Sequence, residues 1–104
     1  MNAQISGFEW DDGNRDKCLK HGVSVAAIES LFDRPIAIFP DPEHSRAETR
    51  FKAIGKTDAG RSVLIVFTLR HRRGETFVRP ISARYMHAKE VEHYEKEAAK
   101  AADR

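Results

Sequence analysis

The sequence predicts one α+β domain, in which a twisted and mainly antiparallel sheet follows two N-terminal helices and precedes one C-terminal helix. Helix-capping residues and apolar residues at helical spacing precede residue 35, segments of strand character fill residues 36–83, and a helical period returns from residue 86 to about residue 100. The 104 residues suit one compact domain, and no repeat or linker divides them. We therefore treat residues 1–104 as a single domain.

The two N-terminal helices are predicted from their caps. Asp11 or Asp12 can cap a first helix that runs to about Lys20, and Ser24 can begin a second helix that ends before Pro35. The apolar positions of the second helix lie on one face, which requires a sheet to cover it.

Five segments read as strands, and the fourth is predicted to be central. It contains the apolar run "SVLIVFTL", which is typical of a strand covered on both faces. A tight Arg73-Gly74 connection leads from it to the last strand, where Pro80 removes a backbone donor and indicates a bulge or an unpaired position. The five segments are residues 5–10, 36–39, 50–55, 61–69 and 75–83.

The positive charge is concentrated in this last hairpin. The whole chain has 18 Lys and Arg against 16 Asp and Glu, or +2, which is too mild to indicate nucleic-acid binding by itself. Residues 70–84, however, contain five arginines and only Glu75 as an acid, and five minus one gives +4. The distribution of charge, and not its total, is therefore informative.

Composition also sets the expected compartment and excludes some chemistries. Cys18 is the only cysteine, so no internal disulfide can form, and neither a leader peptide nor a membrane-length apolar run is present; we expect a cytoplasmic protein. The five histidines never stand three or four residues apart, and no glycine-rich phosphate loop occurs. We predict neither a metal site nor a cofactor, and a buried structural role for Cys18.

The arginines are candidates for binding phosphate, because a guanidinium group donates two parallel hydrogen bonds and stays charged. Arg70, Arg79 and Arg84 belong to the last two strands, and Arg50 and Lys52 belong to the preceding strand, within lateral reach. On a regular strand Arg79 and Arg84 would point to opposite faces, so a shared site requires either a bulge at Pro80 or a strand that ends before Arg84. The alternative is that these side chains only solvate an exposed sheet face.

Metal-free RNA cleavage also requires groups that transfer protons to and from the reacting oxygens. His21 or Glu48 can exchange protons, and Tyr85 can donate a proton or stack on a base. His21 and Glu48 each have a simpler alternative role: His21 can satisfy the end of a helix, and Glu48 can pair with Arg50.

Three segments in the same order resemble the BrnT toxin family, within the RelE-like group of bacterial ribonuclease toxins. The resemblance covers residues 8–95 and includes "FEWDDGNRDKCLKHGVS", "FKAIGKTDAGRSVLIVFTLR" and "RPISARYMHAKEVEHYE". It implies a RelE-like sheet protein that cuts RNA without metal and halts translation. It also implies a cognate BrnA-like antitoxin that neutralises the toxin in an oligomeric complex and makes the contacts with operator DNA.

The resemblance also assigns site residues. They are Lys20, His21 and Gly22 in "KHG", Glu48 and Arg50 entering a strand, Thr68 and Arg70 on the next strand, and Arg79, Ile81 and Arg84 on the last strand. Many relatives have asparagine in the first helix where this chain has Cys18, which puts the register of Lys20 and His21 in question.

A second hypothesis is a non-enzymatic subunit that uses the basic sheet to hold an acidic peptide or to contribute to operator DNA binding. Intact arginines with no proton-transfer residue near them would favour this binding subunit, whereas a histidine or glutamate beside them would favour the ribonuclease.

Overall fold

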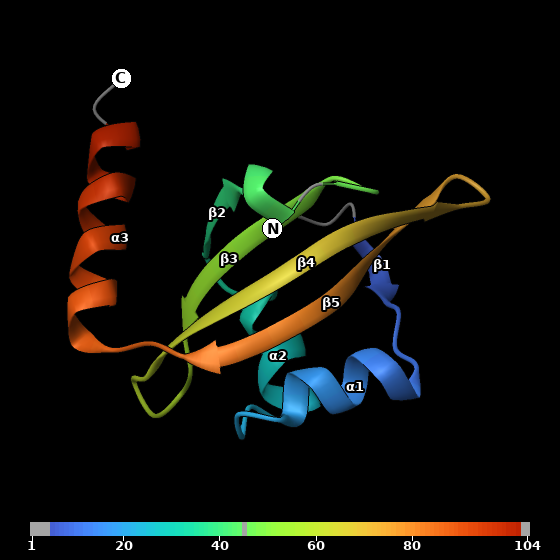
Figure 1. Cartoon of the computed structure of the whole chain (residues 1–104), viewed down its shortest axis with the longest axis horizontal. Coiled ribbons are helices and arrows are strands. Elements are labelled where there is room, and N and C mark those ends of the chain that lie inside the picture. The colour runs from blue at the N-terminus through green and yellow to red at the C-terminus, as the bar shows by residue number, and fades with distance from the viewer. Residues whose placement is uncertain (1–4, 45, 103–104) are drawn as a thin grey trace.

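The computed structural model describes residues 5–44 and 46–102, which form three α-helices, one short 3₁₀ helix and a five-stranded sheet (Figure 1). The elements in chain order are β1 (Ile5–Phe8), α1 (Asp12–Leu19), α2 (Val25–Leu31), β2 (Ala37–Pro40), η1 (Pro42–His44), β3 (Arg50–Lys56), β4 (Ser62–Arg72), β5 (Glu75–Tyr85) and α3 (Ala88–Ala102). The α+β class is confirmed, while the likeness to RelE stays a prediction. No helix in the described part of the chain is long and apolar enough to span a membrane.

The sheet has the strand order β1-β5-β4-β3-β2, so β4 is its central strand, as predicted. Strands β2 to β5 pair antiparallel along the chain, whereas β1 pairs with β5 in parallel. The sequence did not specify this parallel pair. It places Glu9, in the segment that follows β1, beside Arg79 of β5 and Arg70 and Arg72 of β4.

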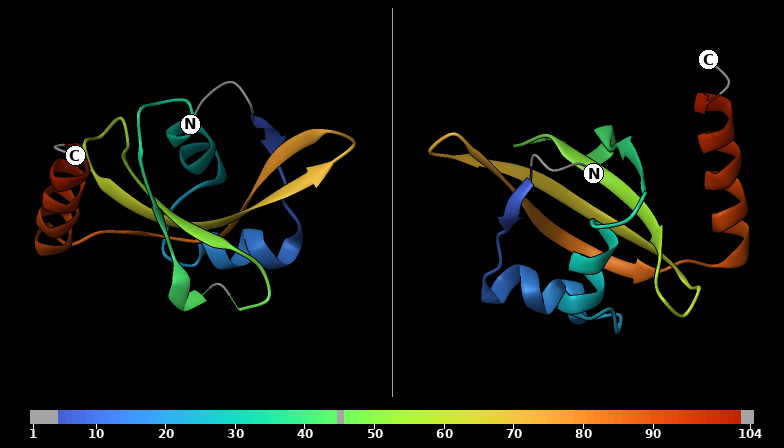
Figure 2. Two further views of the ribbon diagram at one scale, coloured as in Figure 1. Left: turned by 90° about the horizontal axis from the view of Figure 1, so that it is seen from above. Right: turned by 180° about the vertical axis from the view of Figure 1, so that it is seen from behind.

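Both N-terminal helices begin at side-chain caps. Asp11 accepts a hydrogen bond from the Asn14 backbone N–H, and the Asn14 side chain accepts one from the Asp11 N–H, which forms a capping box. Ser24 caps α2 through the backbone N–H of Ala27. The two helices lie together on one side of the sheet, whereas α3 stands at the opposite end from the tip of the β4–β5 hairpin (Figures 1 and 2).

The core lies between α1, α2 and the sheet face that they cover. Cys18 and Ile28 of the helices pack with Val63, Ile65 and Phe67 of β4. The rings of Phe32 and Phe67 also pack edge to face, with their centres 5.3 Å apart. On the other sheet face, Leu64 and Thr68 are buried while Val66 is half-buried, so the covering of β4 on that face is partial.

A β-bulge in β5 decides which arginines share a face. Val66 pairs with Ser82, but its neighbour Phe67 pairs with Pro80, so Ile81 is an extra residue with no partner on β4. This confirms the irregularity predicted at Pro80. Because of the extra residue, Arg79 and Arg84 point to the same side of the sheet although they are five positions apart.

The buried Asn14 side chain holds the bulge in place. Its amide nitrogen donates a 2.8 Å hydrogen bond to the carbonyl of Pro80 and a 3.0 Å bond to the carbonyl of Glu9. A buried carbonyl without a partner is costly, so this amide satisfies a backbone group that the irregular pairing would otherwise leave unmatched. Helix α1 is thereby linked to the strand that carries Arg79.

We expect Ile65→Ala to reduce the free energy of unfolding by about 2–5 kcal/mol, because it removes buried contacts and leaves a cavity. Ile38→Ala is the matched control, since Ile38 is 39% exposed and Ile65 only 1%. Chemical denaturation of both variants measures the difference, and equal stabilities would contradict the position of Ile65 in the core.

We expect Asn14→Asp to destabilise the fold by about 1–3 kcal/mol, because the carboxylate can still accept the capping bond but cannot donate to Pro80. Arg15→Ala on the exposed side of α1 serves as the control. Denaturation curves test the cost. An Asn14→Asp variant as stable as the control would show that the amide does not support the bulge.

Candidate functional site

The sheet face opposite α1 and α2, which we call the open face, carries the basic side chains. Strand register defines it, because residues that pair directly point to the same side. Thr68 of β4 pairs with Arg50 on one side and with Arg79 on the other, so these three side chains share a face. Leu64 lies four residues before Thr68 on β4 and so points to the same face, and it pairs with Arg84. The cations of β3, β4 and β5 on this face are Arg50, Lys52, Lys56, Arg70, Arg72, Arg79 and Arg84.

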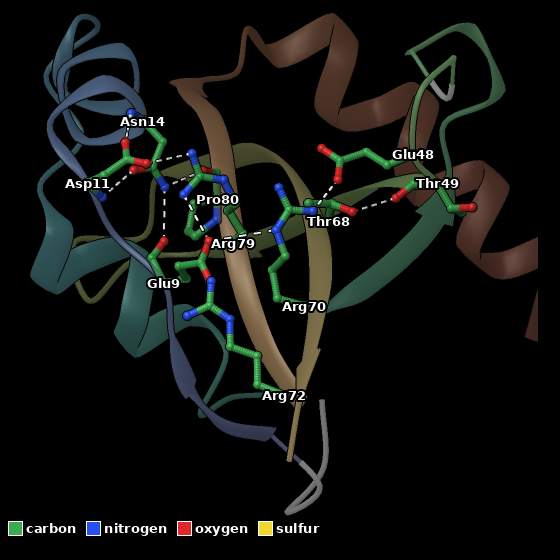
Figure 3. Close-up of polar contacts among 10 residues, drawn as sticks. All are labelled: Glu9, Asp11, Asn14, Glu48, Thr49, Thr68, Arg70, Arg72, Arg79 and Pro80. Carbon is green, nitrogen blue, oxygen red and sulfur yellow. Dashed lines mark hydrogen bonds and ion pairs between the residues drawn. The ribbon is translucent and has the colours of Figure 1, made fainter. Parts of the chain in front are cut away.

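One half of the open face is an ion-pair network (Figure 3). Glu9 lies at its centre, 3.2 Å from Arg79 and 3.6 Å from Arg70, and also contacts Arg72. At the two ends, Asp11 pairs with Arg79 at 2.9 Å and Glu48 pairs with Arg70. We call these six residues, Glu9, Asp11, Glu48, Arg70, Arg72 and Arg79, the arginine network.

The arginine network balances its own charge, with three arginines against three carboxylates. The pKa of Asp11 is lowered, first by the hydrogen bond from the Asn14 backbone and then by Arg79. The pKa of Arg70 is raised, mainly by its hydrogen bond with Glu48. Both shifts favour the charged forms, so an incoming phosphate would have to replace a carboxylate to bind these arginines.

The other half of the open face contains a pocket of about 340 Å³ with an excess of positive charge. Lys17 and His21 come from α1 and the turn after it, Arg50 and Lys52 from β3, and Arg84 from β5. An apolar floor between these cations is formed by Leu64, Val66 and Ile81, and Tyr94 of α3 adds an aromatic wall. We call this the basic pocket.

Arg84 connects the basic pocket to α3 through a bidentate ion pair. Its two terminal nitrogens donate to the two carboxylate oxygens of Glu90 at 2.8 and 2.7 Å. This pairing, together with the backbone N–H of His87, lowers the pKa of Glu90 to about 2. The same contact is the main cause that raises the pKa of Arg84.

The structure brings some of the predicted site residues together and separates others. His21, Arg50, Lys52 and Arg84 line one pocket, and Arg70, Arg79 and Glu48 belong to the adjacent arginine network. The two parts meet along the row in which Arg50, Thr68 and Arg79 pair. The Thr68 hydroxyl donates to the Thr49 carbonyl at 2.7 Å, which ties this row to the segment that carries Glu48.

Two predicted residues lie away from these parts. Tyr85 pairs with the core residue Val63 and therefore points to the helix-covered side, where the guanidinium of Arg61 lies 3.7 Å from its ring centre. Lys20 caps α1 as an exposed residue and does not line the basic pocket.

Sequence reasoning missed several residues that shape the site. Glu9 was expected only as part of a strand and Asp11 only as a possible cap, while Lys17, Glu90 and Tyr94 fell within predicted helices and were given no role in the site. A weak indication was available for Glu9, because it lies between Phe8 and Trp10 at an alternating, outward position. The parallel pairing of β1 with β5, which brings Glu9 to the arginines, had no such indication.

Thiol reactivity and metal binding are two further kinds of chemistry that the side chains of this protein could support. Cys18 is fully buried, and burial raises the pKa of its thiol to about 11, which agrees with a structural role. Within residues 5–44 and 46–102, no group of three or more His, Cys, Asp or Glu side chains is arranged to hold a metal ion.

The fold and site define a small α+β protein whose sheet presents a cationic pocket suited to a phosphate-rich ligand. A family model described as "Ribonuclease toxin, BrnT, of type II toxin-antitoxin system" matches residues 10–90. The match covers most of the chain, and the protein belongs to this family of ribonuclease toxins, which implies an antitoxin partner. A search of curated proteins found no match.

The lowered pKa of Glu90 gives a direct test of its pairing with Arg84. We expect the pKa of Glu90 to be about 2 in the native protein and to rise toward its ordinary value of 4.5 in Arg84→Met, where the hydrogen bond from the His87 backbone remains. A group with a lowered native pKa stabilises the fold above about pH 4.5, and this contribution disappears as the pH falls toward 2.

Carboxyl NMR titration of Glu90 measures both values. Arg61→Met is the control, because Arg61 lies over Tyr85 on the opposite face and should leave the midpoint unchanged. A Glu90 midpoint that is the same in all three proteins would contradict the ion pair.

Proposed function

We propose that this toxin is a metal-independent endoribonuclease that cuts RNA at the basic pocket, halts translation in the cytoplasm, and is kept silent by a BrnA-like antitoxin. The observation that carries the proposal is the Ile81 bulge, which puts Arg84 on the same face as Arg50 and Lys52. His21 lies at the rim of the same pocket and supplies a group able to transfer protons.

The basic pocket suits a nucleotide unit of RNA in charge and size. Its volume of about 340 Å³ falls in the range of small-molecule sites, roughly 300–1,000 Å³. The guanidinium group of Arg50 matches the fork geometry of a phosphate, and Arg84 has further N–H groups beyond the two that donate to Glu90. Lys17 and Lys52 add further positive charge.

In the proposed reaction, His21 removes the proton from a ribose 2′-hydroxyl, and the 2′-oxygen attacks the adjacent phosphorus. A bond forms between phosphorus and the 2′-oxygen, and the bond to the 5′-oxygen breaks. The leaving 5′-oxygen takes up the proton that His21 removed, which gives a 2′,3′-cyclic phosphate and a 5′-hydroxyl end and returns His21 to its starting state. Arg50 and Arg84 stabilise the charge that develops on the phosphoryl oxygens.

Glu48, Arg70 and Arg79 have a role further along the RNA in this proposal. Arg79 and Arg84 pair with residues four positions apart on β4, which corresponds to about 13 Å at ~3.3 Å per residue. That spacing suits two phosphates of one strand that are not adjacent but are separated by one further nucleotide. Glu48 is the second candidate for proton transfer, and it becomes available when a phosphate takes its place on Arg70. Lys20, exposed beside His21, contributes to RNA affinity.

Metal independence is supported by the charges already present at the pocket. Lys17, Arg50, Lys52 and Arg84 offer permanent cations where the transition state gains negative charge. Two acids form ion pairs with these cations: Glu90 pairs with Arg84, and the buried Asp41 pairs with Lys52 at 3.9 Å.

The antitoxin is proposed to cover the open face with acidic side chains and to form an oligomeric complex with the toxin. Positive charge at the basic pocket favours an acidic partner there. Contacts with operator DNA belong to the antitoxin in this proposal. The position of His21 beside the pocket cations favours the ribonuclease over a non-enzymatic binding subunit.

We expect the purified chain to cut single-stranded RNA in the presence of EDTA and to leave 2′,3′-cyclic phosphate ends. His21→Ala should reduce the rate by about 10²–10⁴-fold through loss of proton transfer. Arg84→Lys should reduce it by about 10²–10³-fold, because lysine keeps the charge but not the fork.

Arg15→Lys, on the exposed surface of α1, is the control for these variants, and melting curves confirm that each is folded. RNA that stays intact in EDTA but is cut after addition of Mg²⁺ would refute metal independence. Folded His21→Ala and Arg84→Lys proteins with wild-type rates would refute the location of the site.

A further inference from the structure

We infer that the basic pocket also contains a binding subsite for one unpaired RNA base, with Tyr94 of α3 as its stacking wall. The inference rests on the proposed RNA-cleaving function and adds the part of the substrate that the pocket recognises. It starts from the two different surfaces that the pocket presents, a cationic rim and an apolar floor.

The apolar floor is unexpected on a surface that binds only phosphates. Leu64, Val66 and Ile81 lie on the floor between Arg50 and Arg84, and the bulge itself supplies Ile81. Phosphate groups gain nothing from apolar contact, whereas the face of a nucleobase does. A flat, weakly polar group attached to a phosphate therefore matches this combination of surfaces.

Tyr94 is placed to complete the subsite. It lines the basic pocket from α3, and its ring lies 5.5 Å from the ring of Phe39, tilted by 50°. Phe39 pairs with Lys52 and so points to the open face, where it backs the tyrosine. The ring of Tyr94 is half-buried, which leaves part of it able to contact a ligand.

The ion pair between Arg84 and Glu90 positions this wall. Glu90 and Tyr94 are four residues apart on α3, so they lie on the same side of that helix. The bidentate contact therefore fixes the side of α3 that faces the pocket. Tyr85, the aromatic residue that the sequence suggested for stacking, points to the other face and cannot fill this role.

Base stacking on an aromatic side chain contributes enough to affinity to be measured. A stacked base typically contributes about 5- to 150-fold in binding, and the effect tolerates different bases because each has a π face. The subsite should therefore distinguish RNA with bases from an abasic backbone of equal charge more strongly than it distinguishes one base from another.

The test compares two uncleavable ligands, a 2′-O-methyl RNA oligonucleotide and an abasic oligonucleotide with the same number of phosphates. We expect the native protein to bind the base-containing ligand at least about 5-fold more tightly. Tyr94→Leu should reduce this ratio to near one and leave the affinity for the abasic ligand unchanged. Tyr94→Phe should keep the ratio, because the ring is retained.

Glu97→Leu, an exposed position on α3, controls for the change in helix composition. A Tyr94→Leu protein that keeps the full preference for bases, or that loses affinity for both ligands equally, would overturn the subsite. Because neither ligand can be cut, this outcome is separate from a failure of the cleavage assay, which alone would refute the proposed function.

Discussion

The site depends on one departure from strand alternation, the extra residue Ile81 in β5. Without it, either Arg79 or Arg84 would point into the helix-covered core, where a guanidinium group could not be satisfied. With it, both arginines lie on the open face, and Ile81 itself becomes part of the pocket floor. Asn14 secures the same bulge from α1, so one side chain links the helix cap, the sheet register and the position of the basic residues.

The open face divides its charges in a way that residue counts do not reveal. In the arginine network, three carboxylates neutralise three arginines, and Glu9 touches all of them. The described residues that line the basic pocket include the cations Lys17, Arg50, Lys52 and Arg84 and no aspartate or glutamate, while Glu90 pairs with Arg84 and Asp41 with Lys52. Under the proposed function, the long-range attraction for RNA would therefore come mainly from the pocket, while the ion pairs of the network join the segment after β1 to β4 and β5.

Much of the fold could be predicted from local signals. The Asp11 and Ser24 caps, the central position of β4 and the irregularity at Pro80 each depend on a few neighbouring residues whose chemistry is unambiguous. The parallel pairing of β1 could not be predicted, because it joins residues about 70 positions apart and no alternation pattern specifies the partner.

The positions of the candidate site residues could likewise be predicted where they depend on local sheet geometry, and could not be predicted where they depend on long-range packing. Arg50, Lys52 and Arg84 could be expected on one face once a bulge was assumed, because sheet geometry relates them directly. Tyr94 and Glu90 could not, since the place of α3 relative to the sheet depends on tertiary contacts. The direction of Tyr85 could not be predicted because the last strand was expected to end at residue 83; β5 continues to Tyr85, so alternation with Arg84 turns Tyr85 to the helix-covered side.

The attachment of α3 has a consequence for motion. This helix is joined to the sheet through the Arg84–Glu90 pair and the contact between Phe39 and Tyr94, whereas α1 and α2 are anchored in the core. Regions with fewer buried apolar contacts open locally at lower free energy than the core strands. The backbone amides of α3 should therefore exchange their hydrogens with solvent well before those of β4. Under the proposed function, such a local opening of one helix would widen the entrance to the basic pocket for a strand of RNA without disturbing the sheet.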